Sequence, residues 1–220
     1  MLASGTMAEA GLPASFNLVE EINHRVVNEY SEAIAMLSIA AARMSSGDAR
    51  AALRDTADRL RDHAETHRSL MAPMAMGRTN LADHITKICR SYVRSTLADR
   101  GVQLTLKVED VMMPAETCWR IGLVVAELVR NSARHGLKGK DGRIVVDIAH
   151  RAGHVTCIVS DNGSAGGGSP GRGQRLTRSL IAELGGDIQW FFEPDGTFAF
   201  FGIPSGDGGP QVRRPGAPGR

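Results

Sequence analysis

The sequence predicts an α+β protein: a two-helix hairpin, doubled into a four-helix bundle in a dimer, followed by an α/β sandwich with a mixed sheet. Two observations support this. Apolar residues recur at heptad spacing from residue 19 to residue 71, and helical segments alternate with strand-like segments from residue 80 onward. The chain has 220 residues, of which 42% are hydrophobic, which is enough for a core of this size.

The hairpin is predicted from two apolar seams with spacings of three and four residues. The first comprises Val19, Ile22, Val26, Tyr30, Ala33, Leu37, Ala40 and Met44, and the second comprises Leu53, Ala57, Leu60, Ala64, His67 and Met71. Asn17 is expected to cap the first helix. Because a lone hairpin leaves apolar surface in water, we favour a homodimer through the hairpin over packing on the next domain.

The sandwich is predicted at 80–204, after a hairpin domain at 16–73 and a linker at 74–79. Its expected helices are 80–97, 115–135 and 174–184, and its expected strands are 102–108, 143–149, 154–160, 187–192 and 197–203. Gly185 and Gly186 end the last helix, and Asp195-Gly196 forms a hairpin turn. Residues 1–15 and 205–220 are expected to be disordered, since their small, Gly- and Pro-rich composition cannot form a core.

Charge and cysteine usage exclude several classes of protein. Lys and Arg number 26 against 24 Asp and Glu, so no basic surplus favours nucleic-acid binding. The three cysteines are far apart, which argues against a zinc site or disulfides and indicates a reducing compartment. No segment is apolar enough for a membrane span and the N-terminus lacks a signal-peptide pattern, so we expect a cytoplasmic protein.

His24 is the first candidate functional residue. It lies on the helix face opposite the first seam, with Glu20 and Asn28 four residues away on either side. A carboxylate can orient an imidazole, an amide can position a water, and Arg25 adds a cation beside a phosphoryl group. An ordinary surface histidine is the alternative.

A second group lies on the helix predicted at 115–135. Glu127, Asn131, Arg134 and His135 form a polar stripe on an otherwise apolar helix. An amide oxygen suits Mg²⁺ and an arginine suits phosphate, but a hydrogen-bond network to a loop would use the same residues. The stripe alone does not decide between them.

A third group surrounds the glycine-rich segment. Asp161-Asn162-Gly163 follows a predicted strand, and the glycines at 166–173 open a helix. Backbone N–H groups in such a loop can bind an anion, although the Walker pattern is missing and a flexible loop is equally compatible.

The order of these motifs is more specific than any one of them. It resembles the bacterial sensor histidine kinases, in the class whose phosphoacceptor box reads His-Arg-x-x-Asn. The resemblance rests on EEINHRVVN at 20–28, ELVRNSARHG at 127–136, DNG at 161–163 and GRG at 171–173, and it covers about residues 17–204. It implies a dimeric hairpin followed by a GHKL-type ATP-binding domain.

The resemblance also implies a role for each matching residue. His24 would be the phosphoacceptor, and Asn28 would guide water in dephosphorylation. Asn131 would coordinate Mg²⁺, with Glu127 activating or orienting the reacting groups and possibly joining the metal site. The remaining ATP-binding residues would be Arg134, His135, Asp161 at the adenine, Gly163, Gly171, Gly173 and Thr197.

The implied function is a histidine kinase that phosphorylates His24 from ATP–Mg²⁺ and passes the phosphoryl group to an Asp of a response-regulator receiver domain. Sensory input could come from a separate partner. Arg172 and Gln174 stand where the family usually has apolar residues, and the lid between Gly163 and Gly171 is short. A dimeric phosphorelay adaptor with weak or no ATP use therefore remains an alternative, and an anti-sigma-type Ser/Thr kinase is a third.

Overall fold

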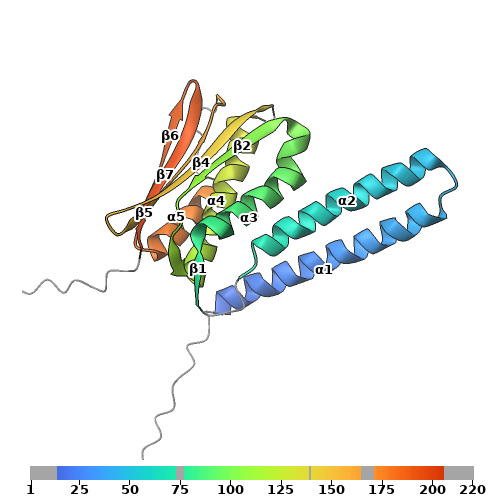
Figure 1. Ribbon diagram of the computed structural model, residues 1–220, viewed down its shortest axis with the longest axis horizontal. Helices are drawn as coiled ribbons and strands as arrows, with labels where there is room; N and C mark the ends of the chain where they lie inside the picture. Colours follow the sequence, from blue (N-terminus) through green and yellow to red (C-terminus); the bar gives the residue numbers. More distant parts are fainter. Residues whose placement is uncertain (1–13, 73–76, 139, 165–170, 206–220) are drawn as a thin grey trace, which may run out of the picture. The chain divides into compact units, whose positions relative to one another are not determined.

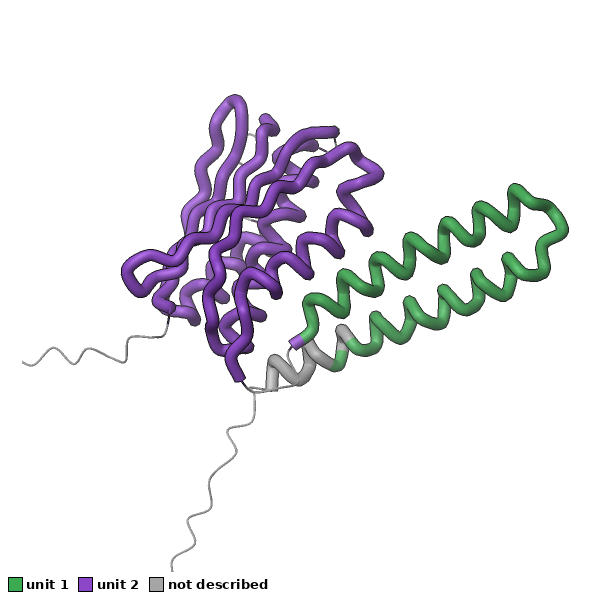
Figure 2. Tube along the Cα trace, viewed as in Figure 1, with its two compact units in different colours: residues 1–71 green, residues 72–220 purple. Residues whose placement is uncertain are grey.

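The computed structural model describes residues 14–72, 77–138, 140–164 and 171–205. The chain divides into two compact units, residues 1–71 and 72–220 (Figure 2). The terminal segments 1–13 and 206–220, the linker residues 73–76, residue 139 and the loop residues 165–170 lie outside the described part, and so do the predictions made for them. At the inner ends of the segments predicted to be disordered, the prediction is wrong: Ala14 and Ser15 are helical, and Ser205 is buried and donates its N–H to the Gly153 carbonyl at 2.9 Å.

The first unit is an antiparallel helical hairpin of α1 (Ala14–Arg43) and α2 (Gly47–Ser69) (Figure 1). Ser46 caps α2, because its Oγ accepts the N–H of Ala49 at 3.4 Å. The prediction that Asn17 caps α1 is wrong. The helix already begins at Ala14, and neither Gly nor Pro stands between Ala14 and Asn17 to interrupt it.

The buried residues of α1 are offset by one position from the predicted seam. Val27 and Ala41 are buried, whereas their seam neighbours Val26 and Ala40 are only half-buried and Met44 is exposed. Contact with a single helix covers only part of a broad apolar face, which explains the difference. On α2 the predicted seam holds, since Ala57 and Ala64 are buried.

The main part of the second unit is a sandwich of a five-stranded sheet and three α-helices. The sheet contains β2 (Val102–Val108), β4 (Gly142–Arg151), β5 (His154–Asp161), β6 (Asp187–Glu193) and β7 (Gly196–Pro204) in the order β2-β4-β5-β7-β6. β2 and β4 are parallel and the other pairs are antiparallel, so the sheet is mixed, as predicted. The helices α3 (Leu81–Tyr92), α4 (Ala115–Asn131) and α5 (Arg172–Glu183) cover one face (Figure 1).

The sequence pattern misses three local features of this unit. A two-stranded sheet pairs β1 (Arg78–Asn80) with β3 (Met112–Pro114), each only three residues long. The helices predicted at 80–97 and 115–135 both end in a π-helical turn, at Val93–Leu97 and at Ser132–Gly136. The second of these turns becomes part of the candidate site.

The core of the sandwich lies between α4 and the sheet. α4 contributes buried aliphatic residues along most of its length, and the strands meet them with every second side chain, as alternation requires. The fully buried members include Ile121, Val124, Val125, Ile144, Val146, Val155, Cys157, Phe201 and Ile203. None of the described helices is long and apolar enough to cross a lipid bilayer.

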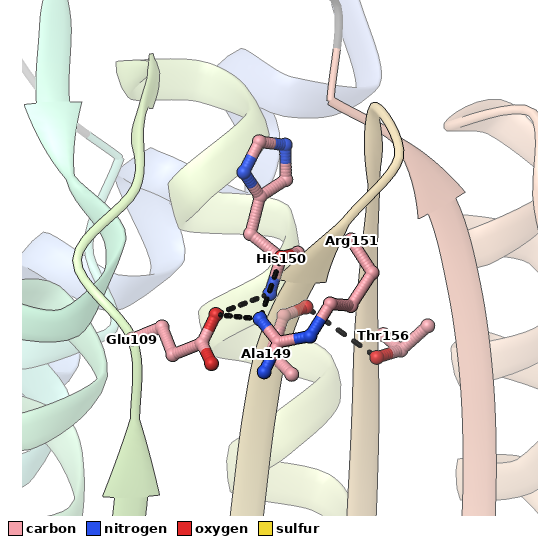
Figure 3. A network of polar contacts seen from close by, with 5 residues as sticks. All are labelled: Glu109, Ala149, His150, Arg151 and Thr156. Atoms are coloured by element: carbon pink, nitrogen blue, oxygen red, sulfur yellow. Dashed lines mark hydrogen bonds and ion pairs between the residues drawn. The ribbon is translucent and has the colours of Figure 1, made fainter.

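A polar network ties the segment before β3 to the β4–β5 hairpin (Figure 3). The Glu109 carboxylate accepts the N–H of His150 at 2.9 Å and a guanidinium N–H of Arg151 at 2.7 Å. The side chain of Arg151, followed by the N–H of His150, lowers the pKa of Glu109. Both charged groups are exposed, so the network orients the connection more than it stabilises the fold.

We predict that His84 makes this unit less stable in acid. Its Nε2 is buried without a hydrogen-bond partner among the described residues and lies beside Gly122 of α4. Burial, followed by the charge of Lys87, lowers the pKa of His84. The folded state therefore binds this proton less readily than the unfolded state, and the free energy of unfolding falls as the pH drops below about 6.5.

The measurement is urea unfolding at about pH 8 and about pH 5.5, a range that spans the usual histidine titration. Tryptophan fluorescence reports this unit specifically, because Trp119 and Trp190 both lie in it. His84→Leu should lose less stability on acidification than the wild type, while a control at the exposed His154, His154→Gln, should behave like the wild type. Equal losses in all three proteins would contradict the prediction.

Candidate functional site

The polar residues at the end of α4 lie together in the folded chain. Glu127 and Asn131 are one turn apart on α4, and Arg134 and His135 follow on the π-helical turn. Glu127 is only 9% exposed and forms an ion pair with Arg130, a residue the sequence analysis did not single out. Arg134 and His135 are exposed, so the stripe runs from a buried carboxylate to cationic and aromatic groups at the surface.

Asp161 is a buried carboxylate at the end of β5. It accepts the N–H of Gly163 at 3.0 Å and the hydroxyl of Thr197, which sits opposite it on β7. These two donors fix the orientation of the carboxylate and leave acceptor capacity, because an ionised carboxylate has about four lone-pair sites. Asp161 can therefore receive a further donor from a ligand.

Two glycines allow the loop after β5 to approach the end of α4. A Cβ on Gly163 would overlap the carbonyl group of Gly136, and a Cβ on Gly136 would meet the Asp161 carboxylate. The N–H of Ser164 donates to the Gly136 carbonyl at 3.2 Å, which secures the approach. Gly163 thus shapes the site through the backbone.

A third close approach involves Gly173 in the first turn of α5. A Cβ at this position would overlap the Glu127 carboxylate, so the absence of a side chain lets α5 begin directly against that group. Among the described residues, no heavy atom lies within 4 Å of the place where a Cβ of Gly171, the N-cap residue of α5, would be. The two glycines of the GRG motif therefore have different structural roles.

These elements enclose a cavity of about 450 Å³, within the usual size range of small-ligand sites. Seven of the predicted site residues line it: Glu127, Asn131, Arg134, His135, Gly171, Gly173 and Thr197. Asp161 and Gly163 support the wall from behind, through Thr197 and Gly136 respectively. His24 and Asn28 lie on α1 in the other unit, where both are exposed, as predicted for His24.

The cavity also contains residues that the sequence analysis missed. Trp190 and Phe192 of the edge strand β6 line it, together with Arg130. A signal for the aromatic pair exists in the sequence, because six of the ten Phe, Tyr and Trp residues lie between 190 and 201. This concentration is compatible with core packing alone, and only the sheet register shows which of the rings face the cavity.

Family comparisons match both units. Residues 21–96 match the family described as histidine kinase, HisKA_2, and residues 82–186 match the histidine kinase-like ATPase domain, HATPase_c_2. The chain belongs to the histidine kinases. No curated protein matches this kinase in sequence.

Solved structures agree on the fold of this kinase. The histidine kinase domain of the blue-light activated kinase EL346 from Erythrobacter litoralis matches with a TM-score of 0.57 and 21% identity, over 81% of this chain and 96% of that one. The kinase AdeS from Acinetobacter baumannii matches with a TM-score of 0.52 and 14% identity, over 84% and 96%. The longer EL346 structure is covered over 63% of its length, with a TM-score of 0.53, 18% identity and 90% of this chain.

The fold predicted from sequence, a helical hairpin followed by a GHKL-type sandwich, is therefore confirmed, and so is the activity class. The protein is a protein-histidine kinase of two-component signalling. This class uses ATP and a response-regulator partner in general.

The glycine contacts predict a contrast between two alanine substitutions. Gly163→Ala should destabilise the second unit by roughly 1–3 kcal/mol, because the new methyl group meets backbone that cannot move aside easily. Gly171→Ala should be nearly neutral, since its φ of −75° suits alanine and no atom of the described residues lies within 4 Å of the new methyl group. Urea unfolding followed by tryptophan fluorescence measures both, and equal effects would contradict the contrast.

Proposed function

We propose that this kinase binds ATP–Mg²⁺ in the cavity between α4, α5 and β7, phosphorylates itself on His24 and passes the phosphoryl group to an Asp of a response-regulator receiver domain. The observation that carries the proposal is the convergence of seven motif residues on one cavity. They come from α4 and the turn after it, the start of α5 and β7, and Asp161 stands directly behind Thr197.

The chemistry of the cavity wall suits a nucleotide. Asp161 can accept a hydrogen bond from the amino group of a base, and Arg134 and His135 provide positive charge or hydrogen bonds for phosphates. The N-terminus of α5 at Gly171 and Gly173 adds backbone N–H groups, which favour an anion. We assign these residues, with Gly163 as the loop-shaping residue, to ATP binding.

We assign Mg²⁺ to Asn131, whose amide oxygen is a hard ligand, with Glu127 as a possible second contact. A bound Mg²⁺ neutralises charge on the phosphates during phosphoryl transfer. Glu127 is already paired with Arg130, so its first role would be to orient or activate the reacting groups. The ion pair with Arg130 also gives the buried Glu127 carboxylate a partner of opposite charge beside α5.

His24 supplies the nucleophile. The unprotonated imidazole nitrogen attacks the γ-phosphorus, an N–P bond forms, the bond to the bridging oxygen breaks, and ADP leaves. His24 is exposed on α1, and Arg25, which pairs with Glu21 at 2.5 Å, lies next to it. The phosphoryl group would then move to a receiver aspartate that docks on the hairpin beside His24.

Asn28 lies one helical turn after His24 and is also exposed. An amide at this spacing can hold a water near a phosphorylated partner. We propose it as a positioning residue for dephosphorylation of the receiver domain. Because the three cysteines are buried and unpaired, a reducing, cytoplasmic setting remains our proposal for the location.

The proposed function predicts a specific labelling pattern. With γ-labelled ATP and Mg²⁺, the wild type should acquire acid-labile phosphate, as phosphohistidine does. His24→Gln should remove all label because the nucleophile is lost, while ATP binding measured by calorimetry stays intact. Asn131→Ala and Asp161→Ala should lose label together with ATP binding, each by at least about tenfold, the size expected for one lost charge-assisted contact.

The matched control is His63→Gln, which changes another histidine of the same hairpin and should retain the label. Absence of both label and nucleotide binding in the wild type would contradict the proposal and favour the phosphorelay adaptor. Acid-stable label on a partner would favour the Ser/Thr kinase instead.

We also propose that the kinase dimerises through the hairpin. After α1 and α2 have packed together, α1 still presents a half-buried stripe that includes Val26, Ala33, Leu37 and Ala40, next to the exposed Met36. A second hairpin would cover this stripe and complete a four-helix bundle.

The dimer proposal predicts opposite results for two double substitutions. Ala33→Lys with Ala40→Lys places two charges in the half-buried stripe and should yield monomers by analytical ultracentrifugation. Ala35→Lys with Ala42→Lys adds the same charges at exposed positions, also one heptad apart, and should leave the dimer intact. A monomeric wild type, or dimers in both variants, would argue against this interface.

A further inference from the structure

The strand register places Phe192 in the same row as the proposed base-binding carboxylate. Asp161 of β5 pairs with Thr197 of β7, and Thr197 pairs with Phe192 of β6. Directly paired residues point to the same side of a sheet, so the three side chains form one row on the helix-covered face. Thr197 and Phe192 both line the cavity.

The next row repeats this arrangement without the carboxylate. Val159 pairs with Ala199, and Ala199 pairs with Trp190, and all three residues line the cavity. In both rows the middle residue, on β7, is small. The small side chains of Thr197 and Ala199 therefore leave space above β7. The rings of Phe192 and Trp190 border this space on the side of the edge strand β6.

The two rings differ in how firmly they are held. Trp190 is half-buried, packs on the core, and has the guanidinium of Arg178 from α5 at 5.2 Å from its ring centre. Phe192 is 42% exposed although it lines the cavity. An aromatic ring that remains partly in water at the mouth of a cavity gains burial when a flat ligand covers it.

We propose that Phe192, supported by Trp190, is the residue on which the purine base of the nucleotide stacks. The inference rests on the proposed function, namely that this cavity binds ATP. It adds a residue that none of the recognised motifs includes. Asp161 would read the edge of the base from one end of the row, and Phe192 would cover part of its face from the other.

The opposite face of the same hairpin provides an internal control. Phe191 and Phe198 stack on each other there at 4.5 Å, although Phe198 also borders the cavity, and Phe200 is 36% exposed. Alternation along β7 puts Phe200 on the face away from the helices, because its neighbours Ala199 and Phe201 are buried. Phe200 therefore matches Phe192 in residue type and in exposure, but not in position.

The test is calorimetric binding of ATP–Mg²⁺ and, separately, of inorganic tripolyphosphate–Mg²⁺ to the full chain. Phe192→Ala should weaken ATP binding by about tenfold, which is within the range for loss of one stacked base, and leave tripolyphosphate binding unchanged. Phe192→Tyr should bind ATP like the wild type, because it restores a ring, and Phe200→Ala should do the same. Trp190 fluorescence should also change when ATP binds, and this change should vanish in Trp190→Phe.

The outcomes separate this inference from the function on which it rests. If the wild type binds ATP and Phe192→Ala binds it equally well, base stacking on Phe192 is wrong and the kinase proposal stands. An equal loss for ATP and tripolyphosphate would also overturn it, because the phenylalanine would then shape the cavity and not contact the base. A wild type that binds no ATP would overturn the proposed function, and the inference with it.

Discussion

The candidate site depends on one close approach between two stretches of backbone. The loop after β5 lies directly against Gly136 at the end of α4, because neither Gly163 nor Gly136 carries a side chain. This contact brings a buried strand-end carboxylate and a helix-end polar stripe to the same cavity. Secondary structure alone would leave Asp161 and Asn131 on separate layers of the sandwich.

The sheet order provides the remaining walls. Since β7 lies between β5 and the edge strand β6, a residue at the end of β5 has a small β7 residue beside it and an aromatic β6 residue beyond. α5 begins against Glu127 on account of Gly173, which closes the cavity from the helical layer. The chemical character of the cavity thus changes from charged at α4 to aromatic at the sheet edge.

The sequence predicted much of this architecture because its periodic signals are strong. Strand 102–108 and the helix after the glycine-rich loop appear close to their expected bounds, and seven motif residues of the second unit line one cavity. The π-helical turns could not be predicted, since apolar spacing near a helix end does not distinguish α from π geometry. β1 and β3 are too short to produce an alternation.

The sequence also could not predict that Phe192 faces the cavity. Residues 190–192 are all aromatic, so this part of β6 has no polar–apolar alternation to indicate its inward face. Only the pairing with Thr197 and Ala199 resolves it. Similarly, the apolar seam of α1 predicted the helix correctly but not its most buried residues. The burial of each residue depends on how many other helices pack against α1, which the seam does not show.

The π-helical turn at Ser132–Gly136 has a consequence for how this family of sequences can change length. The turn already holds one residue more than an α-helical turn, because its closing bond runs from the N–H of Leu137 to the Ser132 carbonyl, five residues back, at 2.8 Å. A further inserted residue would exceed even this geometry and would displace Gly136 from Asp161. We therefore expect insertions to be tolerated at the surface turn around Ala152, and to be selected against between Asn131 and Gly136.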